Sequence, residues 1–149
     1  MLIKKIDENL KSAMKKHNDD VVSVLRMLKS AIKNFEIQKK DEATDEEVLK
    51  VIQKEIKQRR DSIESYLSNN RPESAEKEKT EVAILTAYLP EQLSDADLTA
   101  NVQKAIDETG ATGMADIGKV MAVVMPQVAG QADGSQVSAK VRELIAKNG

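Results

Sequence analysis

The sequence contains no cysteine and no tryptophan, and its aromatic side chains are limited to Phe35, Tyr66 and Tyr88. Without cysteine the chain can form neither a disulfide nor a thiolate zinc site, and it has no cysteine nucleophile. With so few aromatics, a core must be built from Leu, Ile, Val, Met and Ala, the mixture that helix–helix packing uses. These absences exclude thiol chemistry and disfavour an all-β fold.

The first half of the chain also lacks glycine and proline. No Gly or Pro precedes Pro72, and all six glycines lie at Gly110 or later, so residues 1–71 contain neither of the residues that most strongly break helices. Apolar residues recur there at spacings of three and four, which places them on one face of a helix. The pattern predicts two amphipathic helices, with the stripes Ile3, Ile6, Leu10, Met14 and Val21, Leu25, Leu28, Ile32, Phe35.

A third and a fourth helix follow in the same half. Thr44 and Glu47 have the spacing of a capping box, and an apolar stripe runs from Val48 to Leu67. Pro72 suits the first position of a fourth helix. Four helices joined by short polar turns predict a domain like a four-helix bundle over residues 1–90.

Pro90 marks the predicted domain boundary, because proline cannot continue the preceding helix. After it, Ser94 can cap a helix that ends at Gly110, and residues 114–125 form a short apolar segment closed by Pro126. A last amphipathic helix begins at Val137. We therefore expect a small three-helix tail domain over residues 94–149, and an all-α protein of two domains.

Charge is distributed unevenly along the chain. The net charge is −2, yet residues 1–40 hold ten Lys/Arg against five Asp/Glu and carry +5. A dedicated nucleic-acid binder is usually far more basic than this chain, so we expect any RNA affinity to be modest and to rest on phosphate contacts. The candidate RNA contacts are Lys4, Lys5, Lys11, Lys15, Lys16, Arg26, Lys29, Lys33, Lys39 and Lys40, and in the tail Lys119, Lys140, Arg142 and Lys147.

Arg59 and Arg60 interrupt the apolar stripe of the third helix, where an apolar side chain is expected. One interpretation is structural: an arginine reaches out from the core edge or pairs with a carboxylate such as Glu55, four residues away. The other interpretation is an anion or RNA-phosphate site.

The sequence offers no catalytic or metal-binding pattern. His17 is the single histidine and lies at a predicted helix end, where it is expected to be solvated. There is no acidic metal-binding loop and no phosphate-binding glycine loop. We predict no catalytic residue, no metal and no cofactor. Charged residues interrupt every apolar stretch near the N-terminus, so we also expect a cytoplasmic protein without a membrane segment.

Five short segments and Tyr66 together resemble the YqeY-like proteins of the GatB/YqeY family; the segments are residues 25–32, 58–63, 88–94, 118–121 and 132–134. The resemblance implies a relation to the C-terminal helical and tail regions of the B subunit of tRNA-dependent amidotransferase, which engage tRNA. It also implies a helical N-terminal region and a three-helix tail. The chain departs from that subunit because it has no catalytic cradle, and its residues 125–129 extend the tail.

The leading hypothesis from this resemblance is a non-catalytic protein that binds tRNA or assists tRNA-linked amidation. Its expected partners are tRNA and an amidotransferase or another translation-related protein. One alternative is a protein–protein adaptor that does not contact RNA. Another is a carbon–nitrogen ligase with glutamine as amide donor, which family labels imply, but no nucleophile or nucleotide site supports it.

Overall fold

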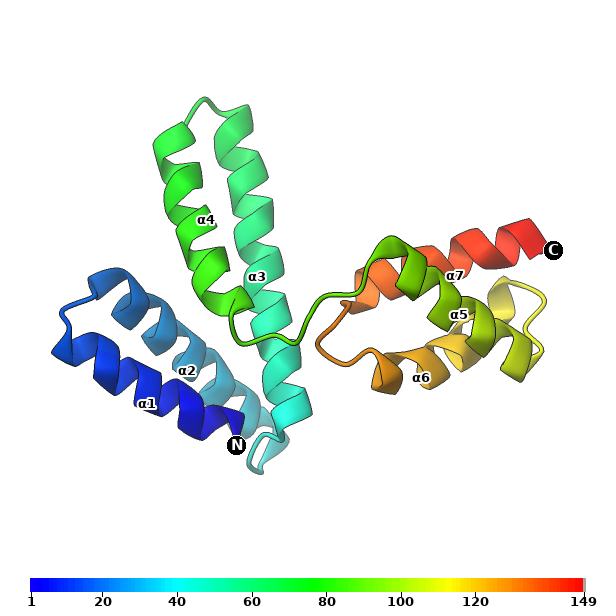
Figure 1. Cartoon of the computed structure of the whole chain (residues 1–149), viewed down its shortest axis with the longest axis horizontal. Helices are drawn as coiled ribbons and strands as arrows, with labels where there is room; N and C mark the ends of the chain where they lie inside the picture. Colours follow the sequence, from blue (N-terminus) through cyan, green and yellow to red (C-terminus); the bar gives the residue numbers. More distant parts are fainter. Residues whose placement is uncertain (149) are drawn as a thin grey trace. The chain divides into compact units, whose positions relative to one another are not determined.

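The computed structural model describes residues 1–148, which are mostly helical (Figure 1). These described residues contain no β-strand, so the predicted all-α class is confirmed. The helices run in the order α1 (Leu2–Lys15), α2 (Asp19–Lys39), α3 (Asp45–Ser68), α4 (Pro72–Thr86), α5 (Asp95–Thr109), the short 3-10 helix η1 (Met114–Asp116), α6 (Ile117–Gln127) and α7 (Gly134–Asn148).

Polar caps fix several helix ends where the sequence predicts them. The Thr44 hydroxyl accepts a hydrogen bond from the Glu47 amide at 3.2 Å, and the Glu47 carboxylate accepts one from the Thr44 amide at 3.1 Å. This pair is the predicted capping box of α3. Ser94 caps α5 in the same way through the Asp97 amide, and Gly110 ends α5 with a φ of 68°.

The chain divides into two compact units, Met1–Leu89 and the remainder from Pro90 onward. Each unit has its own aliphatic core. The core of the first unit is formed by α1, α2, the first half of α3 and the end of α4. Its members are Ile6, Leu10, Val24, Leu25, Leu28, Ile32, Ala43, Val48, Ile52, Ile56 and Leu85. That the two units are independent domains stays a prediction.

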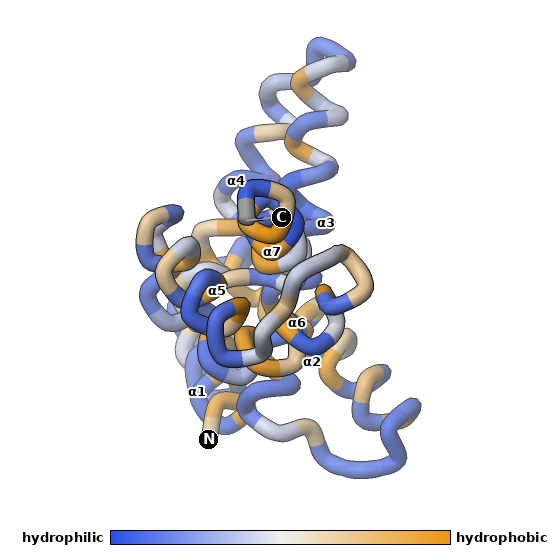
Figure 2. The backbone as a smooth tube through the Cα atoms, turned by 90° about the vertical axis from the view of Figure 1, so that its right-hand side faces the viewer, coloured by the Kyte–Doolittle hydropathy of each residue, from blue (hydrophilic) through white to orange (hydrophobic). Residues whose placement is uncertain are grey.

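The four helices of the first unit pack as two hairpins that share a core at one end. The hairpin of α3 and α4 extends past the hairpin of α1 and α2 (Figure 1). In α3 the buried apolar side chains end at Ile56, and Leu67 is 50% exposed. Small Ala75 of α4 is fully buried in this arm. Figure 2 shows the distal part of the arm as largely hydrophilic. The apolar stripe of α3, predicted to reach Leu67, therefore extends beyond the part of the helix that its neighbours bury.

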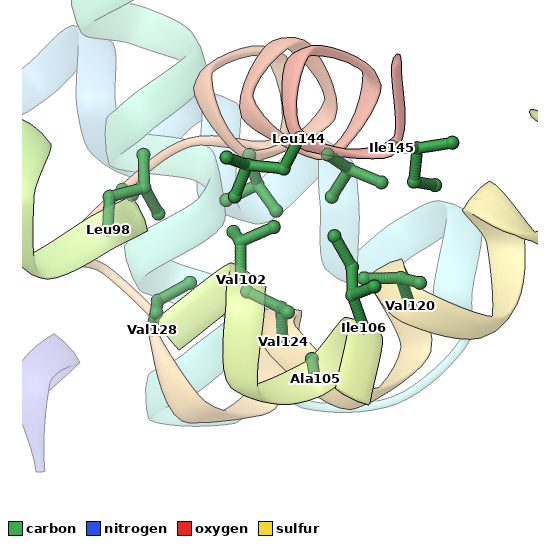
Figure 3. Close-up of a cluster of buried hydrophobic side chains, with 12 residues drawn as sticks. Leu98, Val102, Ala105, Ile106, Val120, Val124, Val128, Leu144 and Ile145 are labelled. Atoms are coloured by element: carbon green, nitrogen blue, oxygen red, sulfur yellow. The ribbon is translucent and has the colours of Figure 1, made fainter. Parts of the chain in front are cut away.

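The second unit packs α5, α6 and α7 around a valine-rich core (Figure 3). Leu98 and Val102 of α5, Val120 and Val124 of α6, and Leu144 of α7 point toward one another in this close-up. Val102, Val120 and Val124 have no exposed surface. Three short helices therefore bury a core of branched side chains without an aromatic residue.

Helix α6 corrects one boundary of the sequence prediction. Pro126 was expected to close the apolar segment, but it lies inside α6, which continues to Gln127. Pro126 is exposed, as is Ala122, whose carbonyl loses its usual partner because proline has no N–H. Water can satisfy that carbonyl at the surface, so the helix can include Pro126 and end at Gln127.

Replacing Thr44 with alanine removes the acceptor for the Glu47 amide and so breaks the capping box. We expect the first unit to lose about 1 kcal/mol of unfolding free energy. Urea unfolding followed by circular dichroism measures the loss. Thr80→Ala is the matched control, because the Thr80 hydroxyl bonds only to the Glu76 carbonyl within α4 and its loss should change stability by less than about 0.5 kcal/mol. Equal losses in the two variants would contradict this role of the cap.

Candidate nucleic-acid interface

Lys140, a predicted RNA contact of the tail, is a buried structural residue. Its ammonium lies 2.8 Å from a carboxylate oxygen of Asp95 in the first turn of α5 and 3.2 Å from Glu143 on its own helix. The hydrogen bond to Asp95, helped by Glu143, raises the pKa of Lys140 above its ordinary value. Only 10% of its side chain is exposed. Lys140 therefore ties α7 to α5 and has little surface left for a phosphate.

Glu143 also holds a second tail cation. Lys147 donates to it at 3.2 Å, and hydrogen bonds from Lys147 and Lys140 lower the pKa of Glu143. Residues spaced by three and four share a helix face, whereas residues two apart do not. The structure thus brings Lys140 and Lys147 together around one carboxylate and places exposed Arg142 on a different face of α7.

Lys119 projects from α6 and pairs with Asp116 at 3.7 Å. Its side chain is 73% exposed. Backbone hydrogen bonds from Thr112 and Gly113, with a smaller contribution from Lys119, lower the pKa of Asp116. Within residues 1–148, Lys119 shares no carboxylate partner with the cations of α7. Lys119 is therefore held by a different carboxylate from Lys140 and Lys147, and Arg142 makes no ion pair in the described chain.

The tail as a whole is acidic. Residues 90–149 contain five basic and eight acidic side chains, a net charge of −3. Four of the five bases are paired with carboxylates: Lys104, Lys119, Lys140 and Lys147. The field of this unit therefore offers a polyanion little attraction.

The burial and the contacts of Arg59 favour the structural interpretation of its position over an anion site. It is 6% exposed and donates to Glu55 on its own helix at 2.9 Å, while its Nε lies 3.9 Å from Glu81 of α4. Burial, together with the charge of nearby Glu78, raises the pKa of Glu81, and Arg59 opposes this shift. Arg59 thus holds α3 and α4 together by an ion pair across the hairpin. Arg60 is exposed.

Most cations of the α1–α2 hairpin are exposed and have no ionic partner. Lys29 pairs with Asp7 at 2.7 Å, and Lys39 pairs with Glu47. The other eight basic residues of this hairpin make no ion pair within the described chain: Lys4, Lys5, Lys11, Lys15, Lys16, Arg26, Lys33 and Lys40. His17 in the turn is exposed, as predicted.

A groove at the junction of α1, α2 and the end of α4 includes residues that sequence reasoning missed. It is lined by Lys5, Asn9, Ser12, Ala13, Lys16, Asn18, Val21, Ile84, Ala87 and Tyr88. Lys5, Asn9 and Ser12 of α1 and its C-cap residue Lys16 recur at spacings of four, three and four, which is a helical period made of polar side chains. That period was visible in the sequence, but the approach of Tyr88 was not.

The described residues hold no cluster of His, Asp or Glu arranged to bind a metal, and none of their helices is long and apolar enough to cross a membrane. The described chain is thus an all-helical protein with a basic α1–α2 hairpin and a groove between α1, α2 and the end of α4. A family model described as Yqey-like protein matches residues 3–145. The chain belongs to this family, as the sequence resemblance predicts.

Fungal relatives extend this assignment. "Altered inheritance of mitochondria protein 41, mitochondrial" of Pyrenophora tritici-repentis is 28% identical over 97% of this chain and 81% of its own length. The protein of the same name from Eremothecium gossypii is 31% identical over 95% of this chain and 79% of its own length. The one from Saccharomyces cerevisiae is 38% identical, over 66% of this chain and 55% of its own length.

These names contradict the cytoplasmic location predicted from the sequence, because the relatives are mitochondrial proteins. The prediction rested on the lack of an uninterrupted apolar stretch near the N-terminus. That feature does not determine a compartment, which explains the error.

Replacing Arg59 with glutamine should destabilise the first unit strongly, because Glu55 and Glu81 would keep their charges at partly buried positions without a cation. We expect a loss of about 3 kcal/mol. Urea unfolding measures it, with Arg60→Gln as the matched control one residue away, for which we expect a change below about 0.5 kcal/mol. A loss of RNA retention in Arg59→Gln with unchanged stability would instead support the phosphate-site interpretation.

Proposed function

We propose that this protein is a non-catalytic accessory protein that binds tRNA, and that the α1–α2 hairpin provides the main contacts to the phosphate backbone. The family resemblance to tRNA-engaging regions of an amidotransferase subunit supports tRNA as the RNA. The relatives' names support a role in a mitochondrial setting for those proteins.

One observation supports the hairpin above all: its cations lack partners while those of the tail have them. Eight of the ten basic residues in 1–40 are without an ion pair in the described chain, against one of five in the tail. A cation already held by a carboxylate must give up that contact to bind phosphate. An unpaired, solvated lysine releases only counterions, which favours association.

The arrangement of the hairpin suits backbone contacts. Lys4, Lys11 and Lys15 share one face of α1, since they are separated by seven and four residues. Lys4 and Lys11 are about 10 Å apart along the helix axis. Long lysine side chains at such spacings can each reach a different phosphate, without any base being read. Binding of this kind should be modest in affinity and sensitive to salt.

In this proposal the tail residues predicted to contact RNA contribute less to binding than the α1–α2 hairpin. Lys119, Arg142 and Lys147 are exposed and can approach RNA, whereas Lys140 and Arg59 serve the fold. Arg60 remains an exposed candidate on α3. An amidotransferase or another translation-related protein is the proposed protein partner.

The variant K4Q/K11Q/K15Q should weaken binding of deacylated tRNA, measured by filter binding at several salt concentrations. Because each lost phosphate contact lowers the salt slope by roughly 0.7 to 0.9, we expect the slope of log affinity against log salt to fall by about 2. The matched variant K119Q/R142Q/K147Q removes the same charge from the tail and should have a smaller effect.

The opposite ranking of these two triple variants would place the main interface in the tail and contradict the proposal. Binding of wild-type protein that is weaker than micromolar, or that does not change with salt, would contradict tRNA binding itself.

A protein adaptor is the second candidate, and α6 favours it. Lys119 is the one charged side chain of α6, and neighbouring Met114 is 53% exposed. An apolar helix surface on an acidic unit suits a protein partner better than RNA. Partners that stay bound after nuclease treatment, together with absent tRNA binding, would favour the adaptor.

A further inference from the structure

The groove between α1, α2 and the end of α4 is electrostatically distinct from the other grooves of the first unit. Its volume is about 450 Å³, within the range of small-molecule sites. Lys5 and Lys16 are its only charged lining residues, and neither makes an ion pair within the described chain. A groove with two free cations and no carboxylate favours an anion.

Two other grooves show the contrast. The larger one near the start of α1 has Lys4 and Lys33 in its lining, but also Asp7, Glu36, Asp41 and Glu42. A third is lined by Asp19, Asp20 and Glu81 with Lys77. Carboxylates outnumber cations in both linings, so neither groove favours a phosphate held inside it. A fourth groove has Lys29 and Lys33 in its lining, but also Glu36, and Lys29 is paired with Asp7. Of these four grooves, the one that contains Lys5 and Lys16 has cations and no carboxylate in its lining.

Hydrogen-bond donors complete an anion site in this groove. The Tyr88 hydroxyl accepts a hydrogen bond from the Asn9 amide at 2.8 Å, which leaves its own proton to donate. The Ser12 hydroxyl has no partner in the described chain. The Asn18 side chain uses its oxygen to cap α2, which leaves its NH₂ group to donate. Charge-assisted hydrogen bonds from such groups suit phosphate oxygens.

The remaining lining residues are apolar. Val21, Ile84 and Ala87 line the groove together with Tyr88, one of three aromatic residues in the chain. An inorganic anion would leave this part of the groove unused. A ligand that joins a phosphate to a flat, weakly polar ring system would use both parts, because bases pack well against aromatic and aliphatic side chains.

We propose that this groove binds a phosphorylated nucleoside, with the phosphate held by Lys5, Lys16 and the neighbouring hydroxyls and the base against Tyr88 and Ile84. The inference deepens the proposed RNA binding and rests on it where the nucleotide is part of an RNA chain. A free nucleotide is the other source of the same chemistry. Backbone contacts at Lys4, Lys11 and Lys15 would then be joined by one site that holds a single nucleotide.

The test measures binding of adenosine 5′-monophosphate to the full-length protein by NMR and by calorimetry. We expect saturable binding, with shifts of amides in residues 5–18 and 84–88, and weaker binding of adenosine and of inorganic phosphate. K5Q/K16Q should lower the affinity for the nucleotide about tenfold or more. K50Q/K54Q removes two exposed, unpaired lysines of α3 and is the matched control, which should bind normally. Tyr88→Phe should weaken binding severalfold.

Competition with tRNA separates the two sources. Displacement of tRNA by the nucleotide supports a nucleotide within RNA, and binding without displacement supports a free nucleotide. If the protein binds the nucleotide but not tRNA, the inferred nucleotide site is supported and the proposed tRNA binding is contradicted. Nucleotide shifts outside the groove, equal losses in K5Q/K16Q and K50Q/K54Q, or no binding at millimolar nucleotide would overturn the inference.

Discussion

Burial of aliphatic side chains along one stripe of each helix is the constraint on which the structure depends. With three aromatic residues in the chain, no large ring can anchor a core, so branched residues such as Leu25, Ile52, Val102 and Val124 must interlock. Each unit satisfies this demand within itself. Most charged side chains therefore lie on the outer faces of the helices. Whether a cation there is already paired with a carboxylate determines whether it is free to bind a ligand.

Ion pairing separates structural cations from available ones. Arg59 and Lys140 are the buried members, and each joins two helices through carboxylates of both. Loss of the Arg59 pairs would leave Glu55 and Glu81 charged at partly buried positions, whereas Asp95 and Glu143, the partners of Lys140, are exposed. Lys4, Lys11 and Lys15 carry the same charge without such ties. The function proposed for the chain follows from this difference more than from the net charge, which is close to zero.

Local features of the fold could be read from the sequence because they depend on residues close together in the chain. The helix stripes, the Thr44 capping box and the Gly110 terminus are of this kind. The pairing of Lys140 with Asp95 and the approach of Tyr88 to Asn9 join residues 45 and 79 positions apart, and periodicity carries no such information. Of the tail pairs, the contact of Lys140 with Asp95 is hidden in this way, whereas Lys119 with Asp116 and Lys147 with Glu143 lie three and four residues apart, a spacing that the sequence does reveal.

The most direct test of the account is the mapping of tRNA contacts on the full-length protein by NMR amide shifts. The account predicts that addition of deacylated tRNA shifts amides of α1 and α2 and leaves α6 and α7 nearly unchanged. Shifts concentrated in α6 and α7, with α1 and α2 unaffected, would contradict it.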